Sequence, residues 1–217
     1  MRSWCTPTTC RRWTGLPETP APSPLSHTLV WGMAFASVCA AAQGLDAADM
    51  AWQFQRPAWV QGAWWQLFTS QWVHLTWGHW LGNAVGFVVM WGGLRLRLSA
   101  RSLLMVYVGG LAGVAAVLAW DTRCLYYAGA SGALHGLWAG GSVLLLLGVS
   151  RGWGMACSVF LAAKLVVPWI WPGVTLSASD FPVYHPAHVA GALGGLVAAW
   201  AITRVRALSP SQSCQGY

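Results

Sequence analysis

Long apolar segments recur along this chain of 217 residues and restrict its fold more than any other feature. Each approaches the ~20 residues that a helix needs to cross about 30 Å of hydrocarbon. Lipid offers the backbone no hydrogen-bond partners, so segments of this length must form helices, and the strict alternation of a membrane β-barrel is absent. We predict an all-α membrane protein with six transmembrane helices, at about residues 28–45, 74–94, 102–120, 129–149, 153–171 and 186–203.

The composition agrees with a membrane protein. Hydrophobic residues make up 56% of the chain and charged residues 8%, and the 17 Trp suit the boundary between hydrocarbon and headgroups. The net charge of +7 does not indicate nucleic acid, because the basic residues form neither a dense run nor an aromatic-flanked stripe. The six Cys form no C-x-x-C pair, so we expect no disulfide framework, no metal site and no cofactor.

The flanks of the apolar region differ from it in composition. Residues 1–27 combine Pro, Ser, Thr and Arg and are too polar to form a core. We predict a disordered cytoplasmic tail over 1–27, a membrane domain over 28–206 and a short C-terminal tail over 207–217. A competing interpretation makes residues 1–42 a cleaved signal peptide, because small residues end an apolar stretch at Ala42, although the polar leader is long for that purpose.

Arginine indicates the orientation of the helices, since Lys and Arg gather on the cytoplasmic side of membrane proteins. The N-terminal tail, alternate loops and the C-terminal end carry Arg2, Arg11, Arg12, Arg95, Arg97, Arg101, Arg151, Arg204 and Arg206. The opposite loops carry Arg56 and Arg123 beside four Asp residues. We therefore predict a multi-pass protein with both termini in the cytoplasm.

Polar side chains collect near the outer ends of the second, fourth and sixth spans. Such residues are costly in a membrane helix unless they face the bundle interior or water, so their agreement in depth indicates a functional site. The residues are His74, His79 and Asn83 on the second span, Ser131 and His135 on the fourth, and His185 and His188 on the sixth.

Ser131 and His188 are the candidate catalytic pair. Each precedes a ladder of glycines, and glycine ladders most often serve helix packing. Two such faces in contact would bring His188 within hydrogen-bond reach of Ser131, as a serine nucleophile requires. No acidic partner is evident, so we predict a dyad; the alternative is that His188 binds a backbone carbonyl.

His79 and Asn83 are the candidate oxyanion donors. They lie four residues apart, about 40° around a helix, and so share one face. Together with the backbone N–H of Ser131 they could stabilise an oxyanion, or they could form a polar pair that joins two helices. His135, one turn inward from Ser131, is a rival base, and His74 could hold the water that hydrolysis needs.

The pattern of these motifs resembles the rhomboid family of intramembrane serine proteases. It comprises His74-x4-His79-x3-Asn83, Gly129-x-Ser131-Gly132 and His188-x2-Gly191-x3-Gly195. The resemblance implies a nucleophile on the fourth helix, Ser131, a base on the sixth, His188, and oxyanion residues on the second. Trp65 matches the family's Trp-Arg loop motif, but Gln66 replaces the arginine, which puts the stability of that loop in doubt.

The stretch from Ser131 to Gly136, Ser-Gly-Ala-Leu-His-Gly, looks like the rhombosortase branch. That branch implies a bacterial inner membrane protein whose substrates are membrane-anchored proteins with a C-terminal Gly-Gly motif, an apolar helix and a basic tail. The predicted function is therefore a serine endopeptidase that cleaves membrane-anchored substrates near the outer face.

Two other functions fit parts of the sequence. A catalytically inactive relative would bind transmembrane segments without cutting them, but the presence of both Ser131 and His188 argues against it. A small transporter would need a polar path across the whole membrane. The polar cluster is confined to the outer half apart from Lys164, which we expect to extend toward the membrane surface or to bind a neighbouring carbonyl.

Overall fold

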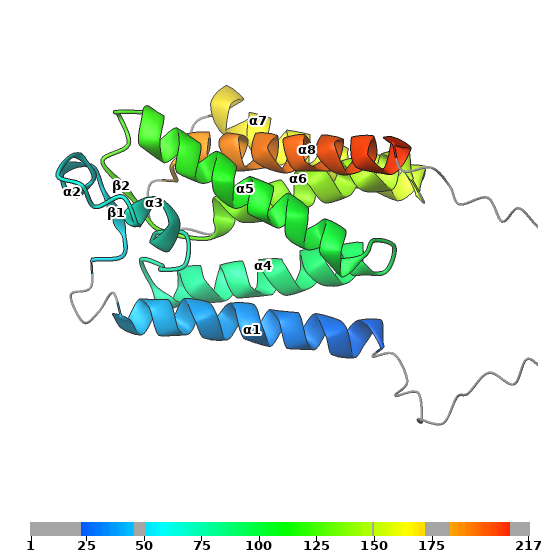
Figure 1. The fold of residues 1–217 in the computed structure, drawn as a ribbon, viewed down its shortest axis with the longest axis horizontal. Coiled ribbons are helices and arrows are strands. Elements are labelled where there is room, and N and C mark those ends of the chain that lie inside the picture. The colour runs from blue at the N-terminus through cyan, green and yellow to red at the C-terminus, as the bar shows by residue number, and fades with distance from the viewer. Residues whose placement is uncertain (1–22, 46–50, 149, 172–182, 209–217) are drawn as a thin grey trace, which may run out of the picture.

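The computed structural model describes residues 23–45, 51–148, 150–171 and 183–208, and these form six long helices with two short helices and one small strand pair. The prediction of an all-helical membrane architecture is confirmed. The elements, shown in Figure 1, are α1 (Pro24–Leu45), β1 (Phe54–Gln55), α2 (Arg56–Val60), α3 (Gln66–Thr69), α4 (Trp77–Arg95), α5 (Ala100–Trp120), β2 (Tyr126–Tyr127), α6 (Ser131–Leu147), α7 (Arg151–Ile170) and α8 (His185–Leu208).

Each predicted span coincides with one long helix, with ends displaced by a few residues. Within the described segments, four helices (α1, α5, α7 and α8) are long and apolar enough to cross a membrane. Helix α6 is apolar but has 17 residues, and α4 has 19.

The first helix begins earlier than the sequence predicts. It starts at Pro24, inside the segment assigned to the tail, because the Ser23 hydroxyl accepts a hydrogen bond of 3.1 Å from the backbone N–H of Ser26 and so caps the first turn. At the other end α8 continues to Leu208. The remaining tail residues, 1–22 and 209–217, lie outside the described part of the chain.

Glycine faces join α5, α6 and α8 into the centre of the bundle. On α8, a Cβ at Gly191 would collide with the carbonyl of Gly132 on α6, and one at Gly195 with the carbonyl of Gly136. The glycine contact predicted between the fourth and sixth spans is thus present. The sequence analysis did not anticipate that α5 joins it, with Gly109 packed on the α8 backbone and against Ala198.

The other long helices flank this centre. Figure 1 shows α1 and α4 side by side, and contacts between their side chains agree. Phe35 of α1 stacks on Phe87 of α4 with ring centroids 4.4 Å apart, and the buried Tyr107 of α5 meets both rings edge-on. Helix α7 packs mainly on α6. Helix α4 is therefore held by α1, and helix α6 by α7.

The loop between α1 and α4 is anchored by Gln66, which stands where the resemblance to rhomboids implies an arginine. Its side chain is buried, with the amide donating to the Ala51 carbonyl at 2.9 Å and its oxygen accepting from the Gln55 N–H at 3.0 Å. Next to it, β1 pairs antiparallel with β2, a strand pair that the sequence analysis did not predict. The loop is thus fixed by amide hydrogen bonds instead of a guanidinium.

Arg56, at the start of α2, ties this loop to the end of α5. Its guanidinium donates to the carbonyls of Leu118 at 2.5 Å and Asp121 at 2.7 Å. These carbonyls lie where a helix runs out of intrahelical partners, so a cation is favoured there. The C-terminal end of α5 and the loop are therefore held in one position relative to each other.

Candidate active site

Ser131 is the first residue of α6, and the turn before it requires glycine. Gly129 has φ +126°, a backbone conformation that L side chains rarely adopt, and its N–H donates to the Ser70 carbonyl at 2.9 Å. The His79 ring lies directly over Gly129, where a Cβ would come within 2.6 Å of the His79 Cε1 atom. Gly129 thus lets α4 approach the beginning of α6.

The structure brings Ser131 and His188 together. The Ser131 Oγ lies 2.9 Å from the His188 Nε2, and the two residues come from α6 and α8, 57 positions apart in sequence. The glycine contact between these helices makes the short distance feasible, and His188 is 7% exposed. A hydroxyl that donates to an unprotonated Nε2 is the arrangement that activates a serine for attack.

His135 contacts the same pair in a different way. Its Nδ1 lies 2.7 Å from the Ser131 backbone oxygen, and because a carbonyl can only accept, this nitrogen carries the proton. The His135 ring stacks on the His188 ring, with centroids 4.1 Å apart and planes at 13°. His135 therefore supports the face of His188, while Ser131 Oγ bonds to His188 itself.

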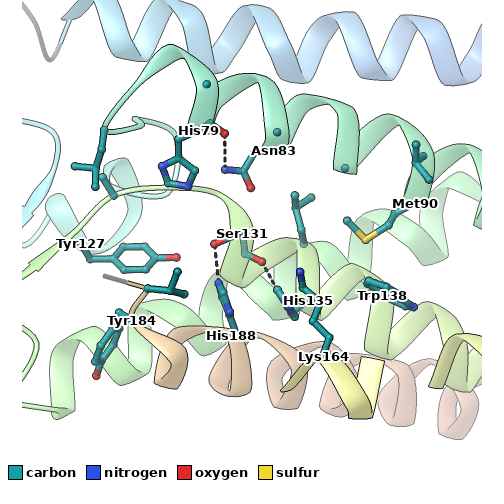
Figure 2. A pocket seen from close by; sticks show the side chains of 18 of the residues that line it. His79, Asn83, Met90, Tyr127, Ser131, His135, Trp138, Lys164, Tyr184 and His188 are labelled. Atoms are coloured by element: carbon teal, nitrogen blue, oxygen red, sulfur yellow. Dashed lines mark hydrogen bonds between the residues drawn. The ribbon is translucent and has the colours of Figure 1, made fainter. Parts of the chain in front are cut away.

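His79 and Asn83 face the Ser131–His188 pair from α4, across the cavity (Figure 2). The Asn83 Nδ2 donates to the His79 carbonyl at 3.1 Å, and the His79 N–H donates to the capping hydroxyl of Thr76 at 3.2 Å. Both side chains line the cavity that Ser131 lines, as predicted for one shared face. Neither has a hydrogen bond to Ser131 in this arrangement.

His74 and His185 lie outside this inner group. His74 is 2% exposed, its ring meets the His79 ring edge-on at 5.0 Å, and it is not among the cavity-lining residues. Its backbone N–H donates to Gln43 of α1 at 2.7 Å. His185 sits 6.0 Å from the His188 ring at the start of α8. His74 therefore packs behind His79, away from the cavity.

A cavity of 870 Å³ opens from the Ser131–His188 pair and extends between α4, α6 and α7. Its lining near the pair is polar, whereas farther along it is made of small and apolar side chains, including Gly82, Gly86, Met90 and Trp138. A volume of this size is typical of a ligand site.

The match to a known family agrees with this geometry. The family model named Rhomboid domain matches residues 61–205, which include every residue of the cavity lining except Gln53. The chain belongs to the rhomboid family. Rhomboid-like protein 11, chloroplastic, of Arabidopsis thaliana is 28% identical over 164 residues, which are 69% of this chain and 56% of that relative. The match thus spans little more than half the length of the plant protein.

This rhomboid is an integral membrane protein, as its family and its apolar helices together show. Its site contains residues that the sequence analysis did not assign to it. Tyr127 of β2, Tyr184 before α8 and Lys164 of α7 all line the cavity. For Lys164 the signal was a cation in the middle of an apolar span; for the two tyrosines no local signal exists, because loop aromatics are common at membrane surfaces.

A hydrogen bond joins two segments at the edge of this rhomboid's site. The Tyr184 hydroxyl donates to Asp121 Oδ2 at 2.7 Å, and Arg123 pairs with the same carboxylate at 2.9 Å. The hydrogen bonds from Arg123 and Tyr184 lower the pKa of Asp121 below its usual value. The end of α5 and the start of α8 are therefore linked through an ionised carboxylate.

Proposed function

We propose that this rhomboid is an intramembrane serine endopeptidase that uses Ser131 as nucleophile and His188 as base. The observation that carries the proposal is the 2.9 Å contact between Ser131 Oγ and His188 Nε2 in the wall of the cavity. Ser131 Oγ attacks the peptide carbonyl while His188 takes the hydroxyl proton, and His188 returns that proton to the leaving amine. Water then hydrolyses the acyl-enzyme, and no cofactor takes part.

The oxyanion in this mechanism is stabilised from two sides. The N–H of Ser131 belongs to the first turn of α6, where backbone donors lack intrahelical partners and the helix dipole favours negative charge. His79 and Asn83 supply the second side from α4. Asn83 donates one of its two amide hydrogens to the His79 carbonyl, which leaves the second for the oxyanion.

The membrane arrangement proposed for this site has six spans and both termini in the cytoplasm. The arginine distribution supports it, and α4 and α6 then count as the second and fourth spans. Ser131 and His188 lie near the outer face in that orientation. A substrate helix has to unwind there, because the backbone of an intact helix is sterically closed to attack.

The substrates in this proposal are membrane-anchored proteins with a transmembrane segment. The stretch from Ser131 to Gly136 resembles rhombosortases, which favours a bacterial inner membrane and substrates with a C-terminal Gly-Gly sorting segment. The plant relative carries "rhomboid-like" and "chloroplastic" in its name, and those words describe that protein.

A fluorophosphonate probe tests the nucleophile on the full chain in detergent. We expect the wild type to be labelled and Ser131→Ala to show no labelling, whereas Ser142→Ala, a buried serine of the same helix, keeps it. Labelling that persists in Ser131→Ala would overturn the assignment of the nucleophile. A folded wild type that takes no probe but binds transmembrane peptides would instead support the non-catalytic alternative.

The base is tested by comparing His188→Ala with His135→Ala in cleavage of a model membrane substrate. Loss of a general base costs about 10²–10⁴-fold in rate, so we expect that loss in His188→Ala. His135→Ala removes the ring that stacks on His188 and the hydrogen bond to the Ser131 carbonyl but no contact to Ser131 Oγ, and it should cost less. A substrate that is still cut by His188→Ala but not by His135→Ala would reverse the assignment.

A further inference from the structure

The Tyr127 side chain reaches the first turn of α6, where the proposed nucleophile lies. It lines the cavity, and Figure 2 shows its ring pointing toward Ser131 with the hydroxyl at the near end. A Cβ placed on Gly132, the residue after Ser131, would lie 3.0 Å from the Tyr127 hydroxyl oxygen. The phenol therefore ends beside the backbone that carries Ser131.

The Tyr127 ring is fixed by its surroundings. Tyr127 belongs to β2, where it pairs with Phe54 of β1, and it is 9% exposed. Its ring meets the Tyr184 ring edge-on, with centroids 6.4 Å apart. The same apolar cluster includes Val114 of α5 and Ala187 of α8. A donor that packing holds in place stabilises a developing charge without first having to reorganise.

The Tyr127 hydroxyl keeps a proton that it can donate. Burial raises the pKa of this phenol above its usual value of about 10, so the group is neutral at physiological pH. Its interactions with the Ser131 hydroxyl and the Gly132 backbone favour the ionised form, as donors to the phenol oxygen do, and so neither interaction uses the phenol proton. Within the described part of the chain, no acceptor is placed to form a hydrogen bond with that proton.

We propose that Tyr127 is a further catalytic residue whose hydroxyl donates a hydrogen bond to the oxyanion. The proposal rests on the proposed protease function and adds a third donor to the Ser131 N–H and the pair on α4. As Ser131 Oγ bonds to the carbonyl carbon, the π electrons of the C=O bond move to its oxygen and the Ser131 proton passes to His188. The phenol donates to that oxygen without transferring its proton, and the C=O bond forms again when the amine leaves.

The developing charge favours this role over a structural one. A buried donor without an acceptor is unfavourable, so the Tyr127 hydroxyl adds nothing to the stability of the fold in this arrangement. A carbonyl oxygen bound next to Ser131 would supply the acceptor. Its negative charge grows as the Oγ–C bond forms, so a hydrogen bond from a fixed donor strengthens most in the transition state.

Tyr127→Phe tests the proposal in the full chain, because it removes the hydroxyl and keeps the ring. Loss of one oxyanion donor costs about 10²–10³-fold in kcat, and we expect that loss in cleavage of a model membrane substrate. KM should not change, because the hydrogen bond is made in the transition state. The midpoint of unfolding in SDS mixed micelles should not fall, since no internal hydrogen bond is lost.

A peptide boronate provides a second measurement that a structural role would not affect. It forms a tetrahedral adduct with Ser131, and one boron-bound oxygen takes the place of the oxyanion. Tyr127→Phe should weaken its binding by about the same factor as kcat, as expected for an analogue of the transition state. Binding of the uncleaved substrate peptide in a Ser131→Ala background should stay the same when Tyr127→Phe is added.

Tyr107→Phe is the matched control. Tyr107 of α5 is 4% exposed, and its hydroxyl also has no hydrogen bond within the described residues. It does not occur among the described residues that line the cavity. The same atom is therefore removed from an equally buried tyrosine away from Ser131, and both kcat and boronate affinity should remain those of the wild type.

Three results would overturn the role of Tyr127. The first is a Tyr127→Phe variant that cleaves like the wild type. The second is a raised KM with unchanged kcat, because the hydroxyl would then bind the substrate equally in its ground state. The third is a fall in kcat with a lower unfolding midpoint and an unchanged boronate affinity, which would assign the hydroxyl to the fold.

The wild type keeps this proposal and the protease assignment apart. A wild type that labels with fluorophosphonate and cleaves, beside a Tyr127→Phe variant that does both equally well, would refute the role of Tyr127 and leave the protease intact. A wild type that neither labels nor cleaves would refute the protease, and the catalytic role of Tyr127 with it.

Discussion

At the scale of single residues, the site depends on two glycines, Gly129 and Gly191, because a Cβ atom at either position would collide with a neighbouring helix or side chain. Gly129 gives the His79 ring room beside the turn that precedes Ser131, and Gly191 lets α8 pack on the backbone of α6. A hydroxyl and an imidazole can meet at 2.9 Å only because these backbones come so close. Small residues thus determine the chemistry as much as the polar residues do.

Gly129→Ala should inactivate the proposed enzyme without unfolding it. Its φ of +126° costs an alanine about 1 kcal/mol or more, and the new Cβ would press on the His79 ring. Misplacement of reacting groups by about 1 Å can cost 100-fold in rate, so fluorophosphonate labelling should slow by roughly that factor. Gly152→Ala, where a Cβ meets nothing within 4 Å, should label like the wild type. Equal labelling of both variants would contradict this account.

At the scale of elements, the packing of helices was predictable where two glycine ladders could be paired by inspection. The ladders that begin at Gly132 on α6 and Gly191 on α8 meet as the sequence indicated. Gly109 of α5 allows the same close packing, but the sequence of an apolar span does not show which neighbouring helix its glycine faces. Likewise the two-residue pairing of β1 with β2 is too short to leave a periodic signal.

Gly195→Ala tests how tightly α6 and α8 are joined. The Cβ would collide with the Gly136 carbonyl, a backbone atom that cannot rotate away, so the helices must separate. Overpacking of this kind typically costs about 1–3 kcal/mol in the free energy of unfolding. Unfolding in mixed micelles with increasing SDS measures the change. Gly93→Ala on α4, where the added methyl meets nothing, is the control, and an equal loss in both variants would mean that the contact is not limiting.

At the scale of the whole molecule, charge distribution and hydrophobicity predicted that three helices would present polar residues at one depth, and His79, Asn83, Ser131 and His188 do line one cavity. The cavity itself could not be predicted, because its shape depends on how far α7 stands from α4. Without the cavity, the sequence predicts only that Lys164 extends toward the membrane surface or binds a carbonyl, whereas the structure places it in the cavity lining. Gln66 was uncertain for a similar reason, since its partners Ala51 and Gln55 are backbone groups without a sequence signature.

The link between Asp121 and Tyr184 makes the stability of the fold depend on pH. Hydrogen bonds from Arg123 and Tyr184 lower the pKa of Asp121 in the folded protein, so its carboxylate contributes stability above the unfolded pKa of about 3.9. That contribution is lost as the pH falls through the lower pKa of the folded state. Asp121→Asn should therefore lower the thermal midpoint near neutral pH, and the difference from wild type should shrink below about pH 4.

The control for this prediction is Asp121→Asn in a Tyr184→Phe background. Without the tyrosine hydroxyl, the hydrogen bond from α8 is gone, so the same substitution at Asp121 should change the midpoint less than in the wild type. A difference between wild type and Asp121→Asn that stays constant from pH 7 to pH 3 would show that the carboxylate charge does not stabilise the fold.

The unequal packing around the cavity has a consequence for engineering. Helices α5, α6 and α8 meet backbone against backbone, so almost any added atom there disturbs the fold. The α4 wall, by contrast, has positions such as Gly82 that accept a side chain, and α7 contributes Lys164 from a helix with few buried residues. Libraries that randomise these two walls should therefore alter which peptides the proposed enzyme accepts, while the packing at the centre of the bundle stays unchanged.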